Sequence, residues 1–205
     1  MKRVQAVRAL RLASKSLPTQ KLAQTPTRFH VENMPTQPFL VLPEVSSERR
    51  AFIPFGFEQP ETLCSNLVKI VPNATTYEFG ILSSTMHNAW VRYTCGRLES
   101  RYRYSAGIVY NNYPWPQDIT DQKREAVSTA AQVVLDARAV HQQGNAPASL
   151  ADLYNPTSMP ANLSAAHKAL DKAVDAAYGK KGVKTDAERV AYLFTLYAQY
   201  TSLLT

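Results

Sequence analysis

The hydrophobic pattern of this chain changes at Pro114-Trp115-Pro116, and that change constrains the fold more than any other feature. Before it, apolar residues come in short β-branched or aromatic runs closed by proline, a pattern typical of strands. These runs lie at residues 39–42, 51–53 and 67–71. Between residues 76 and 91 the apolar residues recur at helical spacing instead, which predicts one helix packed on the sheet.

After residue 116 the sequence predicts helices. Residues 121–142 place apolar side chains on one face, and a second amphipathic stretch begins near Pro160 and should end at Gly179. A third helix begins at Thr185, where Glu188 completes a capping box. We therefore predict an α+β fold, with a mixed strand and helix domain at residues 1–116 and a small all-helical domain at residues 117–205.

The net charge is divided at the same place. Residues 1–116 hold 14 Lys and Arg against 7 Glu and no Asp, a surplus that equals the +7 of the whole chain. Residues 117–205 hold nine basic and nine acidic residues. A basic half joined to a neutral half is typical of a surface that binds a polyanion and rests on a separate support.

Motifs for catalysis and metal binding are missing from the sequence. It has no Gly-rich nucleotide loop, no Walker motif, no His-Glu-x-x-His and no nucleophile elbow. Cys64 and Cys95 form no disulfide framework, and the four histidines lack metal-ligand spacing. We predict no catalytic residue, no metal and no cofactor in this chain.

Targeting signals are also weak. No apolar run approaches the roughly 18–20 residues of a membrane span. The acid-free residues 1–31 have the composition of a mitochondrial transit peptide, but they continue into core-like sequence without an obvious cleavage break. We therefore predict a cytoplasmic protein that does not bind membranes.

The segment best suited to reading DNA bases runs from Arg97 to Arg103. In one extended strand Arg97, Glu99, Arg101 and Arg103 would share a face, because alternate side chains point the same way. Arginine can donate two hydrogen bonds to guanine, and a carboxylate can accept one from the cytosine amino group. The alternative is an exposed Glu–Arg ion pair without any ligand.

Other basic residues are candidates for phosphate contacts. Arg49 and Arg50 form a cluster that either contacts phosphate or is solvated surface, and we predict phosphate contacts for them and for Arg97. A phosphate track could be extended by the basic residues near the amino terminus, Lys2, Arg3, Arg8, Arg11, Lys15 and Lys21.

Several longer motifs are distinctive: PEVSSERR at 43–50, FGILSSTMH at 79–87, CGRL at 95–98, RYRYS at 101–105, IVYNNYPWP at 108–116, LADLYNP at 150–156 and AERVAYLF at 187–194. Through them the chain resembles the carboxy-terminal part of the MmeI-like family. This family comprises single-chain restriction–modification enzymes and related DNA adenine-N6 methyltransferases. The resemblance covers nearly the whole chain.

The resemblance implies most of a target-recognition domain followed by the family's helical carboxy-terminal domain. The family's S-adenosylmethionine loop and its Asn-Pro-Pro-aromatic catalytic loop have no counterpart here. The cofactor would therefore bind elsewhere in the parent protein. The implied partners of this chain are double-stranded DNA and the methyltransferase domain of the same parent.

The resemblance also implies which residues read bases. Glu44 would cooperate with Asn66, Glu99 with Arg101, and Leu67 with Arg103. The predicted function is sequence-specific DNA recognition for a restriction–modification enzyme or adenine-N6 methyltransferase. The alternative is a protein-interaction domain that docks through the helical half and has an incidental basic face.

Overall fold

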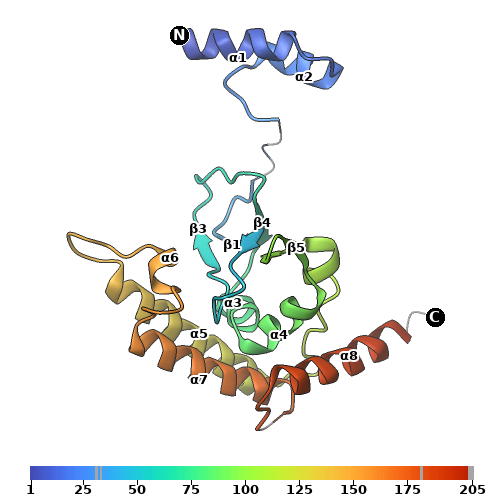
Figure 1. The fold of residues 1–205 in the computed structure, drawn as a ribbon, viewed down its shortest axis with the longest axis vertical. Coiled ribbons are helices and arrows are strands. Elements are labelled where there is room, and N and C mark those ends of the chain that lie inside the picture. The colour runs from blue at the N-terminus through green and yellow to red at the C-terminus, as the bar shows by residue number, and fades with distance from the viewer. Residues whose placement is uncertain (31, 33, 181, 203–205) are drawn as a thin grey trace. The chain divides into compact units, whose positions relative to one another are not determined.

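The computed structural model describes residues 1–30, 32, 34–180 and 182–202 (Figure 1). Residues 203–205, the end of the predicted helical domain, lie outside the described residues. The chain divides into two compact units, Met1–Thr36 and Gln37–Thr205. No helix within the described ranges is both long enough and apolar enough to cross a membrane.

The first unit contains α1 (Lys2–Leu12), α2 (Leu17–Lys21) and the 3₁₀ helix η1 (Leu22–Gln24). Arg11 of α1 organises it, because its guanidinium donates hydrogen bonds of 2.6–2.9 Å to the carbonyls of Leu22, Thr25 and Arg28. Among the described residues of this unit, Ala23 alone is buried. The unit is therefore held by hydrogen bonds and not by an apolar core of its own.

The second unit begins with strands in two antiparallel sheets. One sheet has the order β3 (Gly56–Glu58), β1 (Phe39–Pro43), β4 (Val68–Pro72). The other has the order β2 (Val45–Ser46), β6 (Arg101–Arg103), β5 (Gly96–Leu98). Glu44 lies between β1 and β2, so the chain passes from one sheet to the other at this residue.

The strand predicted at residues 51–53 is wrong. Phe52 and Ile53 are buried in an irregular segment, and strand pairing begins after Pro54, at Gly56. Phe52 instead stacks on the ring of His167, with 3.9 Å between the ring centroids. A long-range ring contact therefore buries this run without strand pairing.

The single helix predicted at residues 76–91 is two helices, α3 (Thr76–Leu82) and α4 (Thr85–Thr94). Ser84 has an extended backbone and its side chain caps α4 by accepting from the N–H of His87. Serine competes in this way with helical backbone hydrogen bonds, which explains the break. After β6 the chain forms a π-helical turn, η2 (Ala106–Tyr110), whose Val109 carbonyl accepts from the indole N–H of Trp90.

The predicted helices after residue 116 are confirmed. They are α5 (Asp121–His141), α7 (Ala161–Ala177) and α8 (Asp186–Ser202), with a short α6 (Leu150–Leu153) added. Gly179 follows α7 with a φ of 70°, which suits a glycine stop. At α8 the Glu188 N–H donates to the Thr185 hydroxyl and the Thr185 N–H donates to the Glu188 carboxylate, so the capping box is present. Together with the sheets these helices confirm the α+β class.

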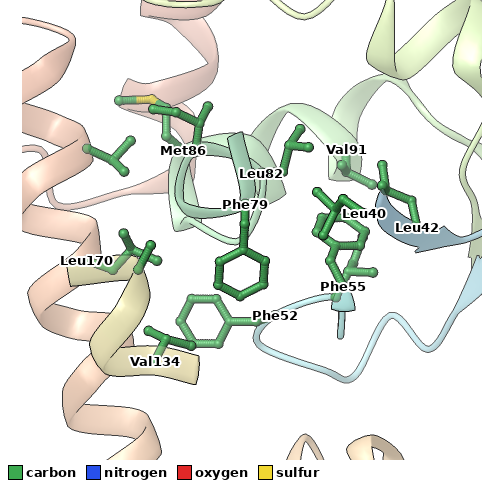
Figure 2. Packing of buried hydrophobic residues seen from close by; sticks show 14 of the residues in the cluster. Leu40, Leu42, Phe52, Phe55, Phe79, Leu82, Met86, Val91, Val134 and Leu170 are labelled. Carbon is green, nitrogen blue, oxygen red and sulfur yellow. The ribbon is translucent and has the colours of Figure 1, made fainter. Parts of the chain in front are cut away.

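One hydrophobic cluster joins the residues before and after 116. Helices α5 and α7 run side by side, and α3 lies between them and the strands (Figure 1). Figure 2 shows Phe79 of α3 between Val134 and Leu170 on the helices and Phe55 on the strand side. Gly80 permits this close packing, because a Cβ there would lie 2.8 Å from Cγ1 of Val127.

Arg138 of α5 ties the helices to the strand segment from within. Its side chain is buried, and it donates to the Phe55 carbonyl at 2.6 Å and to the Tyr154 hydroxyl at 2.7 Å. The boundary predicted at residues 116/117 is therefore crossed by shared packing. The division into domains at this boundary stays a prediction, because the residues on its two sides share one hydrophobic core.

Candidate nucleic-acid interface

Glu44 is fixed where the two sheets meet. Its N–H donates to the Leu67 carbonyl at 2.9 Å, and its carbonyl accepts from the N–H of Tyr104 at 2.7 Å. The first bond holds Glu44 beside the start of β4 and the second holds it beside the end of β6. Three of the residues predicted to read bases, Glu44, Leu67 and Arg103, are thereby brought together.

The carboxylate of Glu44 lies between two cations. Its Oε2 is 3.6 Å from Nζ of Lys69 on β4, and its Oε1 is 3.6 Å from Nε of Arg103 on β6. The side chain of Glu44 is 17% exposed and that of Arg103 is 60% exposed. Sequence reasoning missed Lys69, although it is the one charged residue in the apolar run at 67–71.

Asn66 and Leu67 are exposed in the turn that leads into β4. The Leu67 N–H donates to the Ser65 hydroxyl at 3.2 Å, which shapes the turn. The Leu67 side chain is an exposed large hydrophobic residue at 61%. An apolar side chain presented in this way suits contact with the methyl group of a thymine.

Glu99 and Arg101 lie at the tip of the β5–β6 hairpin. Leu98 pairs with Arg101 across the hairpin, so Glu99 and Ser100 form a two-residue turn. Arg101 Nη2 donates to Glu99 Oε2 at 2.7 Å, and both side chains are exposed. Glu99 has a φ of 57°, in the left-handed region that costs a non-glycine residue roughly 1–2 kcal/mol. Strain of this kind is concentrated at functional sites.

The prediction that Arg97 shares a face with Glu99, Arg101 and Arg103 is wrong, because the chain reverses at residues 99–100. Arg97 pairs across the hairpin with Tyr102, and its guanidinium lies 4.4 Å from the centroid of the Tyr102 ring. Arg101 and Arg103 point to the opposite face, because alternate residues of a strand do so and Tyr102 between them is buried. Arg97 also donates to the carbonyls of Arg92 and Ser100. Its phosphate contact stays a prediction, now from the Tyr102 side.

Arg49 and Arg50 lie in the turn after β2. The Arg49 N–H donates to the Ser47 hydroxyl and the Arg50 N–H to the Ser47 carbonyl. The Tyr102 hydroxyl donates to the neighbouring Glu48 carbonyl at 3.4 Å. The turn is thereby attached to the side of β6 on which Arg97 lies. Arg97 and the backbone of the turn that carries Arg49 and Arg50 therefore lie on the side of β6 opposite to Arg101 and Arg103.

A buried chain of hydrogen bonds joins Tyr104, the residue after β6, to His87 of α4 and Leu82 of α3. The Tyr104 hydroxyl is 3.1 Å from Nε2 of His87, and Nδ1 of His87 is 2.8 Å from the Leu82 carbonyl. Burial lowers the pKa of His87 to about 3, so its ring is neutral. A neutral ring with its proton on Nδ1 donates to Leu82 and accepts from Tyr104. This chain fixes the end of β6 to α4 without any charge.

Metal-ligating residues do not cluster in the part of the chain that the structure describes: no group of three or more His, Cys, Asp or Glu there could hold a metal ion. The exposed side chains of Arg103, Glu99 and Arg101 and the partly buried carboxylate of Glu44 are suited to donating and accepting hydrogen bonds at base edges.

Models of two protein domains match nearly all of this chain. The model for the MmeI target recognition domain matches residues 1–117, and that for the MmeI C-terminal domain matches residues 119–205. DNA methyltransferase A of Bacillus subtilis (strain 168) is 43% identical over 183 residues, which cover 89% of this chain and 20% of that protein.

A solved structure has the same fold. It is that of the Type IIL restriction-modification enzyme MmeI in complex with DNA, which is 45% identical, with a TM-score of 0.88. The match covers 98% of this chain and 26% of that one. The chain thus spans between 20% and 26% of the length of these relatives.

Proposed function

This chain belongs to the MmeI family, and we propose that it reads a short DNA sequence on behalf of a larger restriction–modification protein. The observation that carries the proposal is the grouping of Glu44, Leu67 and Arg103 at the sheet junction. Glu99 and Arg101 lie further along the β5–β6 hairpin that also carries Arg103. Acidic and basic side chains placed beside one another at the junction and on the hairpin supply the acceptors and donors that reading base edges in the major groove requires.

The proposed division of labour follows from the two sides of β6. Arg101 and Arg103 donate to guanine or to another acceptor at a base edge, while Glu99 and Glu44 accept from the amino groups of cytosine or adenine. Asn66 and Leu67 complete the positions read beside Glu44 and Arg103. Arg49, Arg50 and Arg97 contact phosphates, which fix the register but carry no sequence information.

The proposed reaction of the parent protein is transfer of a methyl group from S-adenosylmethionine to N6 of an adenine. The adenine must leave the base stack to reach such a site. The share of this chain is to hold the flanking duplex in register while the adenine is extruded. Its second partner would then be the methyltransferase domain of the same parent protein.

The first experiment measures binding of this chain to random-sequence duplex DNA between roughly 50 and 200 mM salt, where phosphate-based binding changes steeply. We expect affinity to fall steeply with salt, after which selection from a random pool gives the preferred site. No preference in that selection would contradict the proposal.

Arg101→Ala is the sharpest variant. We expect it to relax preference at one base pair by about 1–3 kcal/mol, roughly five- to 150-fold, and to leave the other positions unchanged. Lys123→Ala, which removes an exposed cation from α5, is the matched control and should not change the preference. If Arg101→Ala weakens binding to all sequences alike, Arg101 contacts phosphate and does not read a base.

A second candidate function, protein docking through the helical half, is favoured by the exposed Val133 and Val140 on α5. Apolar docking tolerates added salt, whereas binding through several phosphates does not. A partner retained at high salt and lost with Val140→Asp would support this function. If added DNA displaces that partner, protein docking and DNA binding use the same surface of the chain.

A further inference from the structure

The carboxylate of Glu44 is shared by cations from two different sheets. Lys69 approaches one oxygen from β4, and Arg103 approaches the other from β6. Both separations are 3.6 Å, which is longer than a hydrogen bond and within the range of an ion pair. The two cations therefore attract the carboxylate electrostatically from two directions.

From this geometry we propose that Lys69 is a positioning residue that couples the base preferences of Glu44 and Arg103. The inference rests on the proposed function, because it concerns how two proposed base-reading side chains are held. Glu44 and Arg103 belong to different predicted base-reading sets. A shared carboxylate makes their preferences depend on each other.

The effect of Lys69 follows from competition for one carboxylate. With both cations present, each oxygen of Glu44 has one cation and keeps a lone pair for a base amino group. Without Lys69 the carboxylate is attracted by Arg103 alone, and the Glu44–Arg103 pair tightens. Arg103 then offers fewer free donors to its base, and Glu44 turns away from the base that it reads.

The partial burial of Glu44 makes this coupling stronger than between fully exposed charges. Its side chain is 17% exposed, and that of Lys69 is 35% exposed. Solvent therefore screens the carboxylate less than it screens Glu99, whose side chain is 77% exposed. The backbone bonds from Glu44 to Leu67 and Tyr104 leave its side chain as the part that can respond.

The test compares Lys69→Met and Lys69→Arg with the unchanged chain, with Lys123→Met as the control for loss of one exposed cation. Each is used to select preferred sites from a random pool, and its affinity is measured across salt. We expect Lys69→Met to change the preference ratio about two- to fivefold at both the Glu44 and the Arg103 positions, the range of a partly exposed ion pair. Lys69→Arg keeps the positive charge and should show both preferences at the level of the unchanged chain.

The positions themselves are identified with Glu44→Gln and Arg103→Met. Combining Lys69→Met with Arg103→Met should give no further change at the Glu44 position beyond that of Arg103→Met alone, because the competition has been removed. If the fold-changes of Lys69→Met and Arg103→Met at the Glu44 position multiply, the two substitutions act independently and the coupling is overturned. Thermal unfolding of each variant separates a change in preference from a loss of fold.

Three further results would overturn the inference. Equal weakening on all sequences, with a salt slope reduced by about one, would make Lys69 a phosphate contact. Unchanged preferences in Lys69→Met, with altered ones in Glu44→Gln, would overturn the coupling and leave the proposed function standing. A chain without any sequence preference would remove both proposals.

Discussion

The core between α3, α5 and α7 and the surface at the sheet junction follow opposite physical rules. In the core, Phe79, Val134 and Leu170 pack together and are fully buried (Figure 2). Gly80 leaves no room there for a Cβ. At the junction and the neighbouring hairpin Arg103, Arg101 and Glu99 are exposed, the Glu44 carboxylate is partly buried, and Glu99 has a strained left-handed backbone. Substitutions in the core should therefore lower the stability of the fold, whereas substitutions of the exposed side chains should leave it largely unchanged.

The two regions are nevertheless connected. The hydrogen-bond chain from Tyr104 through His87 to Leu82 joins the end of β6 to the helices that carry the core. Because this chain of hydrogen bonds is neutral and buried, it positions the end of β6 without adding a charge beneath it. Protonation of His87 would destabilise this chain of hydrogen bonds, because it would place a charge in an apolar site.

The largest expected effect is on the core side of the comparison. Phe79→Ala removes a fully buried ring, and we expect a loss of about 3–5 kcal/mol in the free energy of unfolding. Leu67→Ala, at an exposed position, should change it by less than about 0.5 kcal/mol. Urea denaturation measures both. Similar losses in the two variants would contradict the separation.

Acid should weaken the connection between the regions. The pKa of His87 and that of His167 are each lowered by burial to about 3, below the ordinary value of 6.5. Because the unfolded chain binds the protons more readily, the stability is present above pH 6.5 and is lost as the pH falls toward 3. At pH 5 each histidine should cost about 2 kcal/mol relative to pH 8.

The control for this pH dependence is His87→Leu. It should lower stability at every pH, since Tyr104 and Leu82 lose their partner, but it should also make the fall between pH 8 and pH 5 smaller. Val140→Ala, at an exposed and non-titratable position near the end of α5, should leave the pH profile unchanged. An unchanged profile in His87→Leu would show that His87 does not govern the acid response.

A smaller change in stability than those in the core and in acid is expected at the hairpin tip. Glu99→Gly and Glu99→Ala both remove the ion pair with Arg101, but only glycine relieves the strain at a φ of 57°. We expect the glycine variant to be more stable than the alanine variant by about 1 kcal/mol. Both should lose the same base preference. A preference kept in either variant would exclude Glu99 from base reading.

The sequence by itself determined the structural features that depend on residues close together along the chain. Proline closed the runs that became β1 and β4, and the capping box at Thr185 and the stop at Gly179 bounded two helices. These signals are local because a cap or a proline acts on backbone groups within one turn. The family motifs similarly indicated Glu44, Glu99 and Arg101 as candidate base-reading residues.

Only the tertiary structure decided where those residues lie. The short apolar run closed by Pro54 predicted a strand at residues 51–53, but a ring contact with His167 fixed Phe52 instead. Alternation placed Arg97 beside Arg101, but the hairpin turned it to the Tyr102 side. The meeting of Lys69 and Arg103 at Glu44 required two sheets to join. Periodicity reports burial along one segment, whereas strand pairing and chain reversal depend on contacts between distant residues.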